Sequence, residues 1–555
     1  MRCKCVVLIS AVCFLLGLQS VAAPQYAFRI YFHDKIGAPT LGSANSFLSQ
    51  RALDRRTAQG IALDSTDRPV SPDYIDSVLS LTSGKLHMTS KWLNSCVLLL
   101  NDSSQILHLQ GKPYIDSFRY ISYYATPLHK SVVFQNSKFN KEIPISGTAK
   151  TTSYYGSADN QVTMVNGDYL HNLGYRGKGK WIAVLDEGFA NIDAATGFDS
   201  IRSSGRLIDR YDFVAASSTI NTTSDHGTSC LSTMAGTIPN TYVGSAPDAS
   251  YAVYCTEIIA SPDQELEMDN MLAAAEHCDS LGIDIISASI GYNDFLTQWL
   301  ALYHASIDGY TSIAAKAANM ATKKGMLFVA SAGNEGGGSW NYILTPGDAD
   351  SAITIGSVDQ NEVIASSSGY GPNASGVRKP DVCMQGEPAS VLKDGTNVFS
   401  IPGTSFATPQ LAGWAACLWQ ATGPATTPGQ IKRAIVASAN RSVSPDYHYG
   451  YGVPDFKKAL DYLGVKDTPK PTADWIRVLP NPFRNALSVQ IIATVNERAD
   501  IIITDISGRI VYHKSAALTR GDQSFIITPP ALASGVYILR IAANSFRNTM
   551  RIVKQ

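Results

Sequence analysis

The chain has 555 residues, which is too long for a single ordinary core and predicts two to four domains. Charged residues make up only 16% and the formal net charge is -1, so the composition does not support a nucleic-acid partner or an anionic membrane surface. With 45% hydrophobic residues and 43 glycines, the sequence is typical of large globular domains and excludes extensive disorder.

The first 23 residues have the pattern of a signal peptide. Arg2 and Lys4 form a basic start, residues 6–18 are mostly apolar, and small residues precede a cleavage site near Ala23. A membrane anchor is the weaker alternative, because the apolar run is short for a bilayer span of about 20 residues. No later stretch of that length lacks charge, so we expect no integral membrane span.

Six cysteines follow this leader, and none has the CxxC spacing of a zinc site. Export permits disulfides but does not assign them. Cys255 and Cys278 are the candidate pair, since they fall on a predicted strand and on the helix that follows it. Cys230 and Cys417 lie in apolar helical runs, and we expect them to be buried thiols.

Residues 24–150 are predicted to form an α+β module without a catalytic motif. The predicted elements are strands at 26–32 and 95–100 and helices at 46–59 and 72–81. The polar stretch 136–155 predicts a linker to the next domain.

Residues 151–465 alternate strands with helices, which indicates an α/β fold with a parallel sheet flanked by helices on both faces. The predicted strands are 180–185, 283–290 and 326–331, and the predicted helices are 265–279, 301–324 and 405–419. Functional residues of such sheets gather beyond the carboxyl ends of the strands. Asp186 and Asn334 each follow a predicted strand.

The chain after residue 465 changes character. Residues 466–472 contain Thr-Pro-Lys-Pro-Thr, which is typical of a stiff linker. In residues 473–555, short predicted strands alternate with turn signals, a pattern that favours a small β-sandwich. These strands are 487–492, 499–506, 509–513, 523–527 and 535–542.

Three motifs of the middle domain place an aspartate, a histidine and a serine in that chain order. They are Leu-Asp-Glu-Gly-Phe around Asp186, Asp-His-Gly-Thr-Ser around His226 and Gly-Thr-Ser-Phe-Ala-Thr-Pro around Ser405. A serine hydroxyl needs a base to take its proton, and the base needs a carboxylate to hold it. Taken alone, each residue has an ordinary structural reading, such as a helix cap for Ser405. Together they predict a catalytic triad.

A fourth motif, Ser-Ala-Gly-Asn-Glu-Gly, places Asn334 after a strand, where its side-chain amide could donate to a developing oxyanion. Ser405 is predicted at a helix N-terminus, where its own backbone N–H could donate as well. Asn334 before a glycine could otherwise be a simple turn residue.

With these four motifs, residues 152–465 resemble the subtilisin-like serine peptidases, the subtilases. The resemblance implies Asp186 as orienting carboxylate, His226 as general base, Ser405 as nucleophile and Asn334 as oxyanion donor. The segment Ile-Ile-Ser-Ala-Ser-Ile-Gly resembles the family's substrate-binding strand, which implies substrate-binding roles for Ser287, Ser289 and Gly291.

The chain also departs from its relatives. Residues 237–247 lack the Asn-rich loop with which some relatives bind calcium, so we expect no cofactor and assign no metal site, although calcium stays possible. Leu344 falls where relatives have a small residue at the floor of the first specificity pocket, which implies a shallow pocket.

The flanking modules extend the resemblance. Subtilases commonly carry a pro-region, and residues 24–150 have its position and size; a structural module kept in the mature enzyme is the alternative. The tail resembles the type IX secretion sorting domain of Bacteroidetes. The motifs that carry this are Val-Leu-Pro-Asn-Pro-Phe at 478–483, Asp-Ile-Ser-Gly-Arg at 505–509, Ser-Gly-Val-Tyr at 534–537 and Lys554. A carbohydrate- or protein-binding sandwich is the alternative.

The sequence therefore predicts a secreted serine endopeptidase that acts on proteins or peptides and reaches the medium or the outer-membrane surface through the periplasm and the type IX machinery. A dedicated processing peptidase or an esterase of the same fold is one alternative. A surface binding or adhesion protein with a silent catalytic domain is another.

Overall fold

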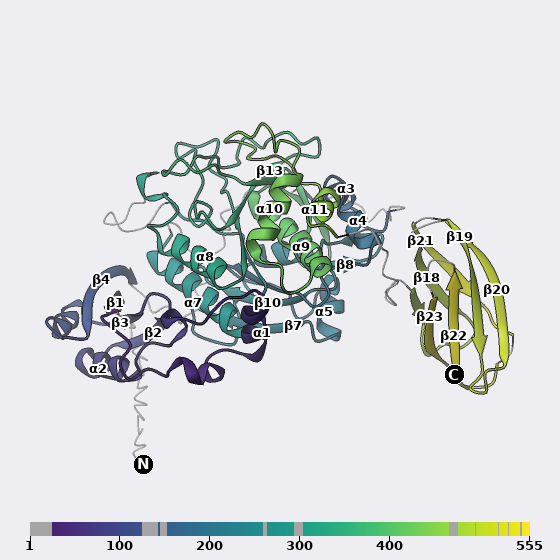
Figure 1. Ribbon diagram of the computed structural model, residues 1–555, viewed down its shortest axis with the longest axis horizontal. Helices are drawn as coiled ribbons and strands as arrows, with labels where there is room; N and C mark the ends of the chain where they lie inside the picture. Colours follow the sequence, from purple (N-terminus) through teal and green to yellow (C-terminus); the bar gives the residue numbers. More distant parts are fainter. Residues whose placement is uncertain are drawn as a thin grey trace, which may run out of the picture.

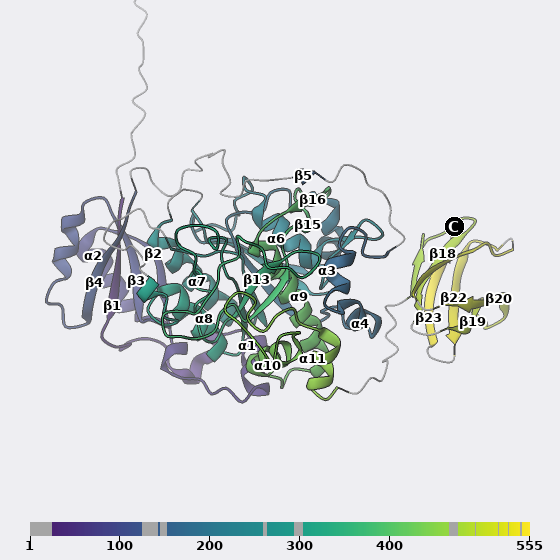
Figure 2. The ribbon, with the colours of Figure 1, turned by 90° about the horizontal axis from the view of Figure 1, so that it is seen from above.

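The computed structural model describes residues 25–124, 143–144, 153–258, 263–293, 304–465, 476–493, 496–519, 521–530, 532–543 and 547–555. The predicted signal peptide and the 466–472 linker lie outside these residues. Figures 1 and 2 both place an N-terminal region against one side of a central body and a C-terminal β-sandwich beyond the other side. Among the helices described, we find none with both the length and the apolar character of a membrane span.

A parallel sheet forms the centre of the molecule. Its strand order is β14-β13-β12-β11-β6-β10-β7, and every neighbouring pair is parallel. The strands are β6 (Trp181–Asp186), β7 (Leu207–Asp212), β10 (Ser250–Cys255), β11 (Ile285–Ala288), β12 (Leu327–Ser331), β13 (Ile353–Val358) and β14 (Val382–Gln385). This confirms the predicted α/β class.

Helices cover both faces of this sheet, as its strands require. The helices α6 (His226–Ala235) and α9 (Thr404–Thr422) lie on one face, and α7 (Glu265–Leu281) and α8 (Ile313–Lys323) lie on the other. Successive side chains of β6 alternate between the two cores: Val184 packs with α9, and Leu185 packs with α7. A strand buried on both faces is continuously apolar, which explains the Trp-Ile-Ala-Val-Leu run before Asp186.

The helix predicted over 301–324 is too long at its start. The helix α8 begins at Ile313, because Ser312 caps it by accepting a hydrogen bond from the Ala315 N–H (2.9 Å). Before the cap, the Asp308 carboxylate accepts the N–H groups of Tyr310 and Thr311, which fixes a turn. Residues 301–303 lie outside the described part of the chain.

The predicted disulfide between Cys255 and Cys278 is wrong. Both thiols are free and buried, and they belong to different hydrophobic cores. Tyr254 of β10 faces the side of the sheet that α7 covers, so the next residue, Cys255, points to the opposite side. Cys230 and Cys417 are buried and free as predicted.

The remaining elements of the central body surround this framework. They are α3 (Asp159–Thr163), α4 (Gly167–Asn172), α5 (Asp199–Ser203), α10 (Pro428–Ser438), α11 (Phe456–Tyr462), β8 (Thr237–Ile238), β9 (Tyr242–Val243), β15 (Ala389–Leu392) and β16 (Val398–Ile401). β5 (Ile143–Pro144) pairs with β16.

The N-terminal region is an antiparallel sheet with two α-helices, as the α+β prediction requires. Its strand order is β2-β3-β1-β4. The elements are β1 (Gln25–Phe32), α1 (Gln50–Ala58), α2 (Pro72–Thr82), β2 (Lys85–Ser90), β3 (Ser95–Leu100) and β4 (Ile115–Tyr124).

Buried ion pairs join the N-terminal region to helix α7 of the central body. Arg29 of β1 donates to Asp269 (Nε to Oδ1, 2.7 Å) and pairs with Glu265 (3.4 Å). Arg56 of α1 pairs with Asp279 (2.8 Å). All five side chains are at most 2% exposed, so their charges depend on one another for solvation.

The C-terminal region is a β-sandwich, as predicted. Its sheets have the orders β17-β18-β21 and β20-β19-β22-β23 and enclose a core of their own. The strands are β17 (Ile476–Leu479), β18 (Leu487–Ala493), β19 (Glu497–Thr504), β20 (Ile510–Leu518), β21 (Gly521–Ile527), β22 (Gly535–Ala543) and β23 (Arg547–Lys554).

Candidate active site

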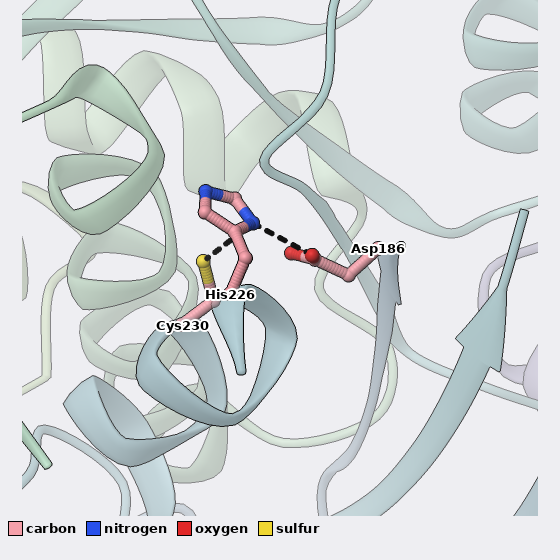
Figure 3. A group of neighbouring side chains, drawn as sticks. All are labelled: Asp186, His226 and Cys230. Carbon is pink, nitrogen blue, oxygen red and sulfur yellow. Dashed lines mark hydrogen bonds and ion pairs between the residues drawn. The ribbon is translucent and has the colours of Figure 1, made fainter. Parts of the chain in front are cut away.

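Asp186 is the last residue of β6, at the carboxyl edge of the central sheet, and its side chain is fully buried. Its Oδ1 accepts hydrogen bonds from the Glu187 N–H (2.9 Å) and from His226 Nδ1 (2.7 Å; Figure 3). A carboxylate can only accept, so Nδ1 of His226 carries the proton and Nε2 is the nitrogen that can accept one.

His226 is the first residue of α6 and is only 6% exposed. Burial lowers the pKa of its imidazole, but the charge of Asp186, together with its hydrogen bond and the contact with Cys230, outweighs this and holds the pKa well above its usual value. The Asp186 carboxylate therefore stabilises the imidazolium that forms when His226 takes up a proton.

Ser405 is the second residue of α9, directly after the turn at Gly403. Its Oγ donates to the carbonyl oxygen of Ser289 (3.3 Å), and the Ser289 hydroxyl donates to the Ser405 carbonyl (2.7 Å). These two bonds fix the start of α9 against the end of β11. The Ser405 N–H lies in the first turn of a long helix, where backbone N–H groups favour negative charge.

Contacts between α6 and α9 tie the backbone of Ser405 to the helix that begins with His226. Cys230, one turn after His226, lies 3.9 Å from His226 Nδ1 and donates to the Ser405 carbonyl (3.3 Å). The ring of Phe406, next to Ser405, lies 5.7 Å from the imidazole centroid. The aspartate and the histidine are hydrogen-bonded, and the serine backbone is tied to the same helix.

Asn334 lies in the turn after β12, beside the start of α9. Its Oδ1 accepts from both the N–H (2.9 Å) and the Oγ1 (3.0 Å) of Thr404. Because Thr404 holds the oxygen, the Asn334 NH₂ group is left as the donor of the amide. This orientation suits an oxyanion donor.

The three expected substrate-binding residues do not share one environment. Ser287 is fully buried within β11, which is paired to β6 and β12 on both sides. Ser289 follows the end of β11 and contacts Ser405, and Gly291 lies two residues further along the chain, beside Leu344. The sequence alone could not show which residues of this segment lie within the paired strand and which follow it, because small side chains occur throughout.

Asp186, His226 and Cys230 form the one group of potential metal ligands found among the described residues, with ligand atoms within 4.8 Å of one another (Figure 3). An ion there would have to displace the hydrogen bond between Asp186 and His226. The donor set therefore fits proton transfer better than metal binding.

The sequence did not indicate two residues that support the site. Cys230 touches His226, and its spacing of four residues on a predicted helix was the available signal. Thr404 orients Asn334 across 70 residues of sequence, and nothing in its local pattern indicates that contact.

Family comparison accounts for most of the chain. The subtilase family matches residues 177–452, which include Asp186, His226, Asn334 and Ser405. The chain belongs to the subtilase family of serine peptidases. The peptidase S8 propeptide domain of Bacteroidota matches residues 27–139, and the secretion system C-terminal sorting domain matches residues 477–555. The predicted family, pro-region and sorting domain are thus confirmed, and the sorting domain indicates secretion by the type IX system.

Several relatives of this subtilase are peptidases. The thermostable alkaline protease of Halalkalibacterium halodurans is 29% identical over 294 residues, 53% of this chain and 70% of the relative. Subtilisin-like protease 1 of Pseudogymnoascus destructans is 32% identical over 214 residues, 37% of this chain and 52% of the relative. Subtilisin DY of Bacillus licheniformis is 27% identical over 294 residues, which are 53% of this chain and 94% of the relative. Among solved structures, the prenylagaramide maturation protease PagA is similar to this chain, with 21% sequence identity and a TM-score of 0.42. The match covers 54% of this chain and 98% of the PagA chain.

Proposed function

We propose that this subtilase is a secreted endopeptidase that hydrolyses peptide bonds through an acyl-enzyme on Ser405. The observation that carries the proposal is the buried hydrogen bond between Asp186 and His226, on a helix that also contacts the Ser405 backbone. The carboxyl edge of the sheet, where Asp186 lies, is the usual location of active sites in parallel α/β folds.

In the first step, the Ser405 hydroxyl turns from the Ser289 carbonyl toward the imidazole and attacks the peptide carbonyl carbon. His226 Nε2 takes the hydroxyl proton, and Asp186 stabilises the resulting imidazolium. The oxyanion receives hydrogen bonds from the Asn334 side chain and the Ser405 N–H. His226 then gives its proton to the amine, the C–N bond breaks, and the acyl-enzyme remains.

In the second step, water attacks the acyl carbon while His226 takes a proton from the water. The ester bond to Ser405 breaks, the proton returns to the serine oxygen, and a carboxylic acid leaves. None of these steps needs a metal, so we place no cofactor in the mechanism.

Active-site labelling tests this proposal. We expect a fluorophosphonate probe to label the wild-type protein and casein to be hydrolysed, whereas Ser405→Ala loses both. Ser444→Ala, at an exposed position, is the control and should behave as wild type. Labelling that survives in Ser405→Ala would contradict the assignment, and a folded wild type without labelling would favour a silent binding or adhesion protein.

A dedicated processing peptidase remains the second candidate. General hydrolysis of casein would favour an endopeptidase of broad use, and cleavage restricted to one defined site would favour a processing role.

We further propose that residues 24–150 are removed during maturation, consistent with the propeptide match. N-terminal sequencing of the secreted protein should then give a start between about residues 125 and 155, the end of a module of ordinary domain size. A mature start near residue 24 would show that the module is retained.

A further inference from the structure

The geometry around Ser405 fixes where a substrate must place the side chain on the acyl side of the scissile bond, and this inference rests on the proposed function. The scissile carbonyl lies between the Ser405 hydroxyl and the Asn334 amide. The preceding N–H of the substrate then faces the Ser289 carbonyl, the present partner of the Ser405 hydroxyl. The side chain between these two groups must enter between the segments that follow β11 and β12.

Each of these two segments presents a glycine to that space. They are Gly291 after β11 and Gly333 after β12, and a side chain at either position would collide with one residue, Leu344. A Cβ placed on Gly333 would lie 2.5 Å from Leu344 Cγ, and one on Gly291 would lie 2.8 Å from Leu344 Cβ. The Leu344 side chain thus fills the slot between the two glycines and is only 7% exposed.

Leu344 is held in this position by its backbone. Its N–H donates to the Ala332 carbonyl (3.1 Å), and the next residue, Thr345, exchanges two backbone hydrogen bonds with Tyr292 (2.9 and 3.3 Å). The segment is therefore tied to both walls of the slot. Moving the leucine out of the slot would break bonds on both sides, so a substrate cannot displace it cheaply.

We propose that Leu344 restricts this subtilase to substrates with a glycine, alanine or serine side chain on the acyl side of the scissile bond. Without the Leu344 side chain, the space between Gly291 and Gly333 would be open to a larger substrate side chain. With the leucine inside, only a side chain of about one carbon fits above it.

The wild-type protein tests this directly, by digestion of a peptide library with identification of the cleavage sites by mass spectrometry. We expect cleavage after small residues to exceed cleavage after phenylalanine or leucine by about 100-fold or more in kcat/KM, since poor fit in an apolar pocket discriminates on that scale. Efficient cleavage after phenylalanine by the wild type would overturn the proposal.

Variants at the same position give the second test. Leu344→Gly should open the slot and move the preference toward phenylalanine by at least about tenfold, whereas the matched control Leu344→Met should keep the wild-type profile because it conserves volume. Fluorophosphonate labelling confirms that each variant is folded, and Leu344→Ala replaces the glycine variant if that one does not label. A labelled, opened variant with an unchanged profile would overturn the proposal. Failure of the proposed function is distinguishable, because no library peptide would then be cleaved in a Ser405-dependent way.

Discussion

At the level of single residues, two opposing effects act on the pKa of the His226 imidazole. Burial lowers its pKa, and the charge and hydrogen bond of Asp186 raise it by more. A general base must be neutral to accept a proton, so a raised pKa keeps His226 inactive up to a higher pH. Activity should therefore rise with pH through a value well above the usual pKa of about 6.5 for a histidine.

Replacing Asp186 with asparagine should reverse this balance. Without the carboxylate, the largest of the effects that raise the pKa of His226 is lost and burial counts for more, so we expect the acid limb of the kcat/KM profile to move to lower pH. The rate itself should fall by about 10⁴, because an amide can donate to Nδ1 and so hold the imidazole in the wrong tautomer. Asp225→Asn, which removes a partly exposed charge next to His226, is the control and should move the limb little. A limb unchanged in Asp186→Asn would contradict the coupling.

The orientation of the Asn334 side chain depends on Thr404, and this dependence can be tested by substitution. Thr404→Val removes the Oγ1 hydrogen bond but keeps the backbone one, so we expect kcat to fall about tenfold with KM unchanged. Asn334→Ala should cost about 10²–10³ in kcat, because it removes an oxyanion donor outright. Thr404→Ser keeps the hydroxyl and should restore the rate, whereas a serine variant as slow as the valine variant would show a packing role instead.

At the level of secondary-structure elements, helix α7 supplies the buried carboxylates that pair with Arg29 and Arg56 of the pro-region. Arg29→Met would leave Asp269 buried without its partner, and we expect this to cost about 3–5 kcal/mol of stability. The measurement is urea unfolding in a Ser405→Ala background, which keeps the precursor intact. Arg210→Met, which breaks an exposed pair with Asp193, is the matched control and should cost less than about 1 kcal/mol. Equal effects of the two variants would show that the buried pair does not hold the pro-region.

Element boundaries also show how far the sequence can be read. The carboxyl-edge positions of Asp186 and Asn334 were predictable, because a buried strand has a continuous apolar pattern that ends at a polar residue: Asp186 itself in β6, and Ser331, just before the turn with Asn334, in β12. The start of α8 was not predictable from apolar periodicity, because it is set by Ser312, whose side chain caps the helix N-terminus. The partner of Asn334 could not be predicted either, because a hydrogen bond across the fold leaves no local pattern.

The whole molecule has separate hydrophobic cores for the peptidase and for the sandwich. Residues of β6, α6 and α9 share one core, while Leu487, Ile501 and Leu539 belong to a core made only of residues from 476 onward. No residue is shared between the two cores as described. The peptidase should therefore keep its stability when the tail is removed.

This separation predicts that delivery and catalysis can be uncoupled. Deletion of residues 473–555 should leave a folded enzyme that labels with the probe but stays in the periplasm. A point variant tests the same idea: Ile501→Asp places a charge in the fully buried core of the sandwich and should abolish export. Ile526→Asp, at a side chain that is 71% exposed and outside the motifs of the sorting domain, is the matched control and should leave the sandwich folded and export intact. The measurement is the enzyme's distribution between periplasm and medium or cell surface. Unchanged export of the deletion variant would contradict the sorting role of residues 477–555.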